Sequence, residues 1–401
     1  MDRRARLWSG DAARRARVPR RMARTRGGGV EGLTPRERRW LLGIGVCYAA
    51  VVIPIGVHKG GDFAAELSQS ERLLHGVPLY DALPGKGIWW PPFTALGLVP
   101  FALVSRASMG VAKALWAILN VSCLGGSLAL ARRWTRGWAP VAIAVAAVGK
   151  PLQSNFEHLN ITPILLALVL ATAAELRAGR ETRAGAWLGL ATAIKAFPAL
   201  MFLYFICTGR WRGLLIGVAV AGGLTLGAML PYGLVGAVHA VLDWARLARE
   251  AATLGTAGSQ SIPGFATFFG WPATAIAALS LACLGAGAVA IRRSIDAHLD
   301  GIAIAALAAV LLSPIAWLYY HTLALPAWLA ALTGHPAAPA RPRRAALWIA
   351  GVLTSGVLTF GLYPRWLWFI SAANYTWGSL LLFAILVLDR LRSPQPVPRS
   401  P

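Results

Sequence analysis

The sequence predicts an all-α polytopic membrane protein. Of its 401 residues, 57% are hydrophobic and only 14% are charged. Apolar runs of a dozen to twenty residues recur from Trp40 to Leu388 with little charge between them, which is typical of membrane-spanning segments. Inside a bilayer the backbone must pair its own polar groups, so helices or a closed barrel are required. These runs are too long and too evenly apolar for barrel strands, so we expect helices.

The apolar segments differ in length. Thirteen are expected, at roughly 40–57, 92–105, 111–131, 138–149, 161–176, 184–194, 197–208, 213–231, 271–291, 301–316, 322–333, 345–362 and 372–388. Several are shorter than the roughly 17–20 residues that a full crossing needs. We therefore expect about 12 transmembrane helices, some of them broken or re-entrant. Whether 92–105 and 111–131 both cross, or one folds back, is left open by the sequence.

The net charge of +23 lies in short clusters between the apolar segments. This distribution is typical of cytoplasmic loops under the positive-inside rule, and it places both termini in the cytoplasm. A nucleic-acid-binding protein would instead carry a compact basic domain, which is missing here. The clusters are Arg132/Arg133/Arg136, Arg177/Arg180/Arg183, Arg210/Arg212, Arg292/Arg293, Arg341/Arg343/Arg344 and Arg390/Arg392.

Three regions are expected along the chain. Residues 1–39 carry 13 Arg and 4 acidic residues without a core pattern, and we interpret them as a disordered basic cytoplasmic tail. Residues 40–390 form a single transmembrane catalytic domain, and 391–401 form a second cytoplasmic tail. The start codon is ambiguous, because Met22 could serve as well as Met1. The four cysteines lie in apolar runs without metal-binding spacing and are interpreted as buried apolar residues.

The charge rule also predicts where the polar residues gather. It leaves a first outer loop at 58–91 and a long outer loop at 232–270 on the side opposite the arginines. Polar turns between short helices are tolerated only where they line a cavity or are buried in protein. We therefore expect one outward-facing polar cavity in the plasma membrane. Its candidate residues are Asp62, Lys150, Asn155, Glu157, His158, Asn160, Lys195, Gln260, Ser261, Tyr320 and His321.

Two lysines are the candidate anion ligands of this cavity. Lys195 interrupts an apolar hairpin, where a charge costs at least about 2.5 kcal/mol. Pro198 breaks the helix three residues later, so we expect Lys195 at a turn facing an anionic ligand, although snorkelling to the interface is the alternative. Lys150 opens the polar stretch "KPLQSNFEHLN" (150–160), whose amides and imidazole suit sugar hydroxyls and phosphate oxygens. The alternative for this stretch is an ordinary solvated loop.

The first outer loop contains the candidate general base. Gly60 and Gly61 let the chain turn sharply after the first membrane segment, which places Asp62 at the membrane edge. A partly amphipathic helix follows, and Glu66 and Glu71 are interpreted as solvated residues on its polar face. Trp89 and Trp90 then return the chain to the bilayer. They match an interfacial aromatic belt and are also candidates for contact with a sugar or lipid.

His321 is the candidate proton donor or phosphate ligand of the cavity. It lies in "SPIAWLYYHTLALP" (313–326), an otherwise apolar stretch opposite the other outer polar turns. A lone histidine in such a stretch is also commonly a structural residue. The sequence leaves both interpretations open.

Taken together, these stretches resemble the family-87 glycosyltransferases of the GT-C superfamily, which are polyprenol-phosphate-mannose-dependent mannosyltransferases. The resemblance covers about residues 44–326, and two departures are "SNFEHLN" for the family's Gly-Gln-x-Asn and "GSQS" for Asn-Gln-Ser. It is carried by Asp62 with "LLHGVPLY", then "WWPPFTALGLVPFALV", "LQSNFEHLNITPILLAL", "AGAWLGLATAIKAFPALMFLYF", "GSQSIPGF" and "LLSPIAWLYYHTLAL".

The resemblance implies an integral-membrane enzyme that transfers a mannosyl or other hexosyl residue from a polyprenyl-phosphate donor to an envelope glycolipid or lipoglycan. It implies an active site on the outer face, a general base at Asp62 and a catalytic role for His321. Inverting transfer needs that base and cations on the departing phosphate, for which Lys195, Lys150 and His158 are the candidates. Sugar and acceptor contacts are expected from Asn155, Glu157, Asn160, Gln260, Ser261, Tyr320, Trp89 and Trp90.

No cofactor is expected, because the sequence contains neither a P-loop nor a dinucleotide-binding motif. Two acids placed as in metal-dependent relatives are not evident, so we expect no divalent metal. One alternative is a transporter or flippase of lipid-linked sugars, although no internal repeat is visible. A non-catalytic scaffold is the other, but it would not need Asp62, Lys195 and His321 on one side. The sugar, the acceptor, the linkage and the oligomeric state are not predicted.

Overall fold

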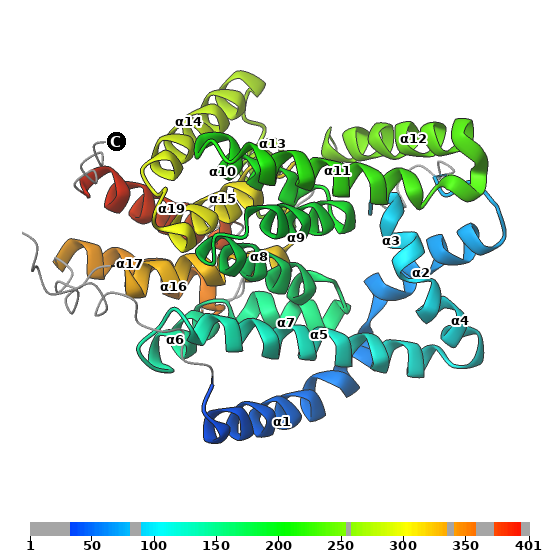
Figure 1. Ribbon diagram of the computed structural model, residues 1–401, viewed down its shortest axis with the longest axis horizontal. Helices are drawn as coiled ribbons and strands as arrows, with labels where there is room; N and C mark the ends of the chain where they lie inside the picture. The colour runs from blue at the N-terminus through cyan, green and yellow to red at the C-terminus, as the bar shows by residue number, and fades with distance from the viewer. Residues whose placement is uncertain (1–32, 81–89, 254–257, 335–340, 358–372, 394–401) are drawn as a thin grey trace, which may run out of the picture.

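A computed structural model describes residues 33–80, 90–253, 258–334, 341–357 and 373–393. Throughout these ranges the regular structure is helical (Figure 1). The elements are α1 (Pro35–Lys59), α2 (Gly61–Leu74), α3 (Pro92–Gly97), α4 (Val99–Ala107), α5 (Met109–Arg132), α6 (Ala139–Ala147), α7 (Gly149–His158), α8 (Thr162–Arg177), α9 (Glu181–Ile194), η1 (Phe197–Met201), α10 (Phe202–Cys207), α11 (Trp211–Gly227), η2 (Leu230–Tyr232), α12 (Gly233–Thr253), α13 (Ile262–Phe268), α14 (Ala273–Arg292), α15 (His298–Leu311), η3 (Leu318–Ala324), α16 (Leu325–Thr333), α17 (Arg341–Ser355) and α19 (Asn374–Arg392).

Among the described residues, every predicted apolar segment overlaps a helix or a pair of helices, and residues 358–362 of the segment 345–362 lie outside the described ranges. Within the described ranges, three helices are long and apolar enough to cross a membrane alone, namely α1, α5 and α14. The pair α11 and α12, bent by 47°, would be a fourth if it is counted as one span. The all-helical, membrane-type architecture is therefore confirmed.

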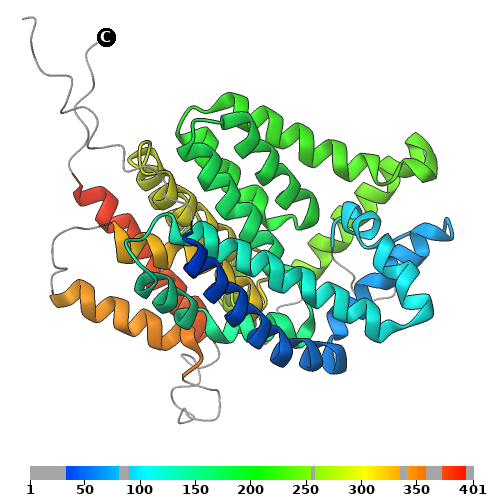
Figure 2. The same cartoon turned by 60° about the horizontal axis from the view of Figure 1, so that its bottom comes forward.

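Helix α1 lies at the edge of the bundle beside α5 in both views (Figures 1 and 2). Its apolar residues Leu42, Ile44 and Val46 are each more than 60% exposed to the surroundings of the protein. Exposed leucine, isoleucine and valine side chains over several turns would be costly in water and are favourable against lipid tails. The outer surface of α1 is thus suited to contact with the bilayer.

The two segments that the sequence left open differ in length. Residues 92–107 form two short helices, α3 of 6 residues and α4 of 9 residues, with a break at Leu98. At 1.5 Å per residue they extend only about 9 and 14 Å, against a bilayer core of about 30 Å. Helix α5 has 24 residues and is a candidate span by its length and composition. Neither α3 nor α4 is long enough to cross alone.

The arginine clusters meet at one end of the bundle. We call this the arginine end and define it by Arg132, Arg177, Arg293, Arg343 and Arg390. Arg132 pairs with Glu37 at 3.0 Å, and Arg177 donates to the Arg133 carbonyl. Arg343 pairs with Asp389 at 2.8 Å, Arg390 pairs with Asp300, and Arg293 donates to the Leu391 carbonyl. Helices α1 and α19 have their arginine-bearing termini at the left of Figure 1.

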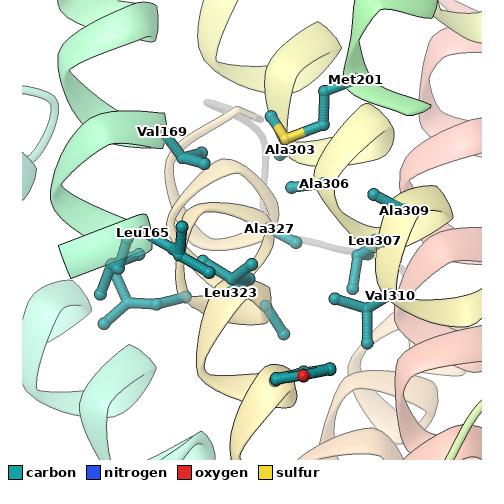
Figure 3. Close-up of a cluster of buried hydrophobic side chains, with 14 of the residues drawn as sticks. Leu165, Val169, Met201, Ala303, Ala306, Leu307, Ala309, Val310, Leu323 and Ala327 are labelled. Carbon is teal, nitrogen blue, oxygen red and sulfur yellow. The ribbon is translucent and has the colours of Figure 1, made fainter. Parts of the chain in front are cut away.

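Helix α15 forms the centre of the core. Residues 299–311 of this helix are all buried, and many of them are alanines, which allow the neighbouring helices to approach closely. Figure 3 shows Ala303, Ala306 and Val310 of α15 facing Leu165 and Val169 of α8 and Met201 of η1. This packed centre holds α8, α9, η1 and α16 in fixed positions, and the candidate site is built on their ends.

A second, smaller apolar cluster lies at the opposite end from the arginines, at the right of Figure 1. It joins α2, α3, η2 and α12 through residues such as Leu73, Ala95 and Met229. Tyr232 adds a hydrogen bond from its hydroxyl to the Val77 carbonyl (2.7 Å). The predicted long loop 232–270 is therefore largely helical where it is described, since it contains α12 and α13. The apolar periodicity of α12 explains this, because one of its faces covers α2 and α3.

Candidate active site

The candidate site is organised by α2. Gly60 ends α1 and immediately precedes α2, and its N–H donates to the Gly56 carbonyl (2.8 Å). Phe63 anchors α2 by stacking on Trp116, with ring centroids 5.3 Å apart, and by an edge contact with Phe101. Residues spaced four and three apart share a helix face. Asp62, Glu66 and Gln69 therefore lie on one face of α2, and each is about one turn from the next.

The Asp62 carboxylate is held by two side chains from distant parts of the sequence. Its Oδ2 accepts hydrogen bonds from Asn160 Nδ2 (3.0 Å) and from the Tyr319 hydroxyl (3.0 Å). Asp62 is only half-buried, so the carboxylate is fixed in orientation without being closed off. A carboxylate placed in this way can accept a proton from a hydroxyl group that approaches it.

Asn160 reaches Asp62 because of an unusual backbone turn after α7. Leu159 adopts φ +54°, the left-handed region that only a few non-glycine residues occupy. Its side chain packs where any Cβ on Gly56 or Gly60 would lie, within 2.5–2.6 Å of that position. The Leu159 carbonyl also accepts a hydrogen bond from the Trp116 indole (2.8 Å). These contacts offset the cost of the left-handed turn and orient Asn160 toward α2.

Lys195 is buried in an aromatic frame near this carboxylate. It follows the last residue of α9 in extended conformation, and its side chain is only 6% exposed. The ammonium lies 4.0 Å from the centroid of the Trp90 ring and 5.6 Å from that of Tyr320. Such cation–π contacts are worth roughly 2 kcal/mol when desolvated. They hold the charge inside the protein, which contradicts the alternative that Lys195 snorkels to the interface.

Two further contacts fix the aromatic frame. The Thr94 hydroxyl donates to the Ile194 carbonyl (2.8 Å), which joins α3 to the end of α9 and so places Trp90 beside Lys195. Phe197 stacks on Tyr320 with ring centroids 4.7 Å apart. The ammonium of Lys195 is therefore positioned by packing from three separate elements.

Glu66 corrects one interpretation made from the sequence. It was expected to be solvated, but it is buried, with 6% of its surface exposed. Glu71, for which the same was expected, is partly exposed and pairs with Arg106. Burial raises the pKa of Glu66 to about 8, with Asp62 adding to the rise and Lys195 opposing it. The amphipathic pattern of α2 did not reveal this, because the cover on its polar face comes from other helices. We call Asp62, Glu66, Trp90, Asn160, Lys195, Tyr319 and Tyr320 the Asp62 cluster.

The stretch 150–158 forms helix α7 rather than a loop, and only part of it joins the Asp62 cluster. His158 lies 5.9 Å from the Tyr319 ring, centroid to centroid, and its Nδ1 contacts the Ser154 carbonyl (2.9 Å). Lys150 and Glu157 are linked through Gln153. The Lys150 ammonium lies 3.5 Å from Gln153 Oε1, and Gln153 Nε2 donates to Glu157 Oε1 (2.9 Å). Glu157 Oε1 also lies 3.9 Å from the Lys59 ammonium.

Asn155 is fully buried, and its Oδ1 accepts from the Thr162 backbone N–H (3.1 Å). This contact ties the end of α7 to the start of α8. The proposed substrate contacts of Lys150, Asn155, Glu157 and His158 stay predictions.

His321 is placed among structural contacts. It is 1% exposed, its Nδ1 lies 2.7 Å from the Ser379 hydroxyl, and its Nε2 lies 2.9 Å from the Gln260 carbonyl. Both ring nitrogens thus have partners within the protein, which is typical of a structural histidine. Ser261 caps α13 by accepting from the Gly264 N–H (3.1 Å). The catalytic role of His321 and the sugar contacts of Gln260 and Ser261 stay predictions, and Trp89 lies outside the described residues.

Metal ligation has no evident site in the part of the chain that the structure describes. No group of three or more His, Cys, Asp or Glu side chains is arranged there to hold an ion. Asp62 and Glu66 come from one helix face, and both interact electrostatically with Lys195. Metal-independent chemistry remains a prediction for experiment.

The fold and the site together define a class: a helical membrane protein with a buried carboxylate–ammonium cluster at the end remote from its arginines. The profile of glycosyltransferase family 87 matches residues 89–314, which is more than half of the chain. The chain therefore belongs to glycosyltransferase family 87. The match includes Trp90, Asn160 and Lys195, and it begins after Asp62 and Glu66.

Curated mycobacterial proteins are similar to this chain. A Mycolicibacterium smegmatis protein named polyprenol-phosphate-mannose-dependent alpha-(1-2)-phosphatidylinositol mannoside mannosyltransferase is 25% identical over 303 residues, covering 67% of this chain and 65% of that protein. A second protein of the same organism, a pentamannoside mannosyltransferase of the same donor dependence, is 31% identical over 137 residues, covering 33% of this chain and 32% of its own length.

A Mycobacterium tuberculosis protein with the latter name is 27% identical over 273 residues, covering 63% of this chain and 59% of that protein. The chain thus spans less than two thirds of the length of each relative. No solved structure gives a significant match.

Proposed function

We propose that this protein is a membrane mannosyltransferase that transfers mannose from a polyprenyl-phosphate donor to a hydroxyl of an envelope glycolipid or lipoglycan. The observation that carries the proposal is the presence of the Asp62 carboxylate and the Lys195 ammonium in one cluster of a family-87 chain. The names of the relatives support this donor and a lipid acceptor.

The proposed reaction is a single displacement with inversion. An acceptor hydroxyl attacks the anomeric carbon, its proton passes to Asp62, and the bond from that carbon to the phosphate oxygen breaks. The hydrogen bonds from Asn160 and Tyr319 both end on Oδ2 of Asp62, so Oδ1 would take the proton. Negative charge develops on the departing lipid phosphate, and a fixed ammonium at Lys195 would stabilise it by several kcal/mol. Asn160 and Tyr319 would keep the carboxylate oriented.

The orientation in the membrane is also a proposal. The positive-inside rule would place the arginine end in the cytoplasm, with both termini, and the Asp62 cluster on the outer face of the plasma membrane. Impermeant maleimide on intact cells would test it, using Glu71→Cys at the Asp62 end and Arg180→Cys at the arginine end in a cysteine-free background. The side chain of Glu71 is partly exposed and that of Arg180 is exposed. Labelling of position 71 alone is expected, and labelling of position 180 alone would reverse the orientation.

Transfer itself is tested with purified protein in lipid nanodiscs, radiolabelled polyprenyl-phosphate mannose and mannosylated phosphatidylinositol as the acceptor. Appearance of label in the acceptor lipid supports the transferase. The same protein in sealed vesicles addresses the alternative of a flippase, because movement of intact donor across the vesicle without any chemistry would support that alternative. No specific observation favours the flippase over the transferase.

A further inference from the structure

Two side chains on α2 are buried without the hydrogen bonds that buried polar groups normally have. They are Glu66, whose Oε2 has no partner, and Gln69, whose Oε1 and Nε2 both have none in the described part of the chain. Gln69 is completely buried. Nearly all buried polar atoms in folded proteins are hydrogen-bonded to protein or to water, and each exception calls for an explanation.

The surroundings of Gln69 satisfy its amide at most in part. The Tyr80 hydroxyl donates to the Trp90 carbonyl (2.8 Å), and its oxygen lies close enough to interact with the Gln69 amide, although without a hydrogen bond of good geometry. The next residue of α2, Ser70, is satisfied by the Ala95 carbonyl (2.7 Å). Even with Tyr80 as an acceptor, the Gln69 Oε1 and one amide hydrogen have no partner among the described residues.

The position of these atoms relative to the proposed chemistry is informative. Glu66 lies one helical turn from Asp62 and interacts electrostatically with both Asp62 and Lys195, so it lies near the proposed base and the proposed phosphate ligand. The transferred sugar must lie between those two groups, because its anomeric carbon forms one bond to the acceptor and breaks one to the phosphate. Gln69 continues the same face of α2 by less than one turn.

We propose that Glu66 and Gln69 form a subsite that binds hydroxyl groups of the transferred hexose and selects the sugar. This inference rests on the proposed function. A hydroxyl both donates and accepts, and so do a carboxamide and a protonated carboxylic acid. Burial keeps Glu66 largely protonated near pH 7, since its pKa is raised to about 8. The two side chains therefore match a sugar hydroxyl better than they match a phosphate or a lipid tail.

The test uses polyprenyl-phosphate mannose donors from which one hydroxyl at a time has been removed. A site built to bind a hydroxyl rejects the analogue that lacks it, so the wild type should lose at least about 100-fold in kcat/KM at the contacted position. Glu66→Leu and Gln69→Leu cannot make the hydrogen bond. Each should lose activity with mannose yet show less than about fivefold further loss with the matching deoxy donor. Glu66→Gln, which keeps a donor and an acceptor, should retain the discrimination.

Glu71→Gln is the matched control, because Glu71 is a carboxylate of the same helix that pairs with Arg106 away from the subsite. It should show the wild-type penalty for every deoxy donor. The subsite is overturned if Gln69→Leu and Glu66→Leu, folded by gel filtration and thermal melting, keep that penalty for every deoxy donor, as expected if water alone satisfies these atoms. If either leucine variant does not fold, Glu66→Met and Gln69→Met replace them, because methionine has a similar length but no strong hydrogen-bonding group. Unaltered discrimination in both methionine variants would equally overturn the subsite.

A failure of the proposed function would look different. The wild type would then transfer no sugar from any polyprenyl-phosphate hexose, with mannose included. A wild type that transfers mannose, combined with variants that keep full discrimination, removes only the subsite.

Discussion

The arginine end and the Asp62 cluster differ in how their charged side chains are partnered. At the arginine end, charged side chains are matched: Arg132 pairs with Glu37, Arg343 with Asp389 and Arg390 with Asp300. In the Asp62 cluster, a lysine, the Asp62 carboxylate and the protonated acid Glu66 are held close together by aromatic rings, an amide and a tyrosine hydroxyl, and Glu66 keeps an unpartnered oxygen.

This difference separates stability from function. Paired charges at the end of a helical bundle fasten neighbouring helices, and their loss should affect folding. Charges that are buried without direct pairing are costly to the folded state. Their retention is therefore best explained by a bound substrate that supplies the missing partners. The following experiments test that comparison, from the largest expected effect to the smallest.

Asp62→Asn should lower the transfer rate by roughly 10²–10⁴-fold, because the amide cannot accept the proton of the acceptor hydroxyl. The isosteric change keeps an oxygen for the hydrogen bonds from Asn160 and Tyr319, so thermal melting should be nearly unaltered. The rate is measured by transfer of radiolabelled mannose in nanodiscs. Glu71→Gln, on the same helix, is the control and should stay near wild type. Full activity in Asp62→Asn would remove Asp62 from the mechanism.

Lys195→Met should reduce kcat by roughly 10²–10³-fold, because one fixed charge on the departing phosphate is lost. Methionine preserves the length and the contact with Trp90 and Tyr320. Single-turnover kinetics with a lipid-phosphate donor measures the chemical step directly. Lys59→Met is the matched control, since Lys59 is an exposed lysine at the end of α1. Equal losses in the two variants would contradict a specific role for the buried ammonium.

Asp389→Asn should lower the free energy of unfolding by about 1–3 kcal/mol, because Arg343 is left partly buried without its carboxylate. The turnover of folded protein should not change. Denaturant titration in detergent measures the first quantity, and the transfer assay measures the second. Asp243→Asn on α12 breaks an exposed pair with Arg246 and should cost no more than about 1 kcal/mol. A tenfold drop in turnover for Asp389→Asn would contradict the assignment of the arginine end to stability and the Asp62 cluster to function.

Glu66 should impose a pH dependence that the arginine end does not. Its pKa is raised to about 8, so the neutral form prevails below that pH and is lost above it. Ionisation adds negative charge beside Asp62 and removes a donor, so the rate should fall roughly tenfold between pH 7 and pH 9. Glu66→Gln should flatten this decline.

The linked effect on stability has the same sign. The folded chain holds the Glu66 proton between about pH 4.5 and pH 8 where the unfolded chain does not, so unfolding free energy falls as pH rises through that window. An alkaline decline that persists unchanged in Glu66→Gln would assign it to another group.

The sequence predicted the helical segments well and the site unevenly. Hydropathy marked every apolar helix, because lipid contact and core packing both demand apolar residues. Asp62 could be proposed as a site residue from the sequence, because Gly60 and Gly61 mark a turn directly before it at the end of the first apolar segment. Glu66 was misread, because the burial of one face of α2 depends on segments far along the chain. Tyr319 and Asn160, for example, lie 257 and 98 residues from Asp62.

Two other differences have similar causes. The stretch 150–158 was interpreted as a loop, since its polar composition hides the helical spacing of Lys150, Gln153 and Glu157. Sequence alone also does not reveal that His321 contacts the Ser379 hydroxyl and the Gln260 carbonyl, and its catalytic role stays a prediction. Gln69 gave no signal at all, because a glutamine on an amphipathic helix is ordinary until its burial is known.

The left-handed turn at Leu159 packs against α1, so this helix also helps to position the Asp62 cluster. The bare backbone at Gly56 and Gly60 forms a notch that receives this leucine. A chimaera in which α1 is replaced by another helix of equal hydrophobicity would still insert into the membrane. A methyl group at position 56 or 60 would, however, displace Leu159 and move Asn160 away from the Asp62 carboxylate. Transferring the proposed sugar specificity to a relative would therefore require Gly56, Gly60 and Leu159 as well as the residues proposed to face the sugar.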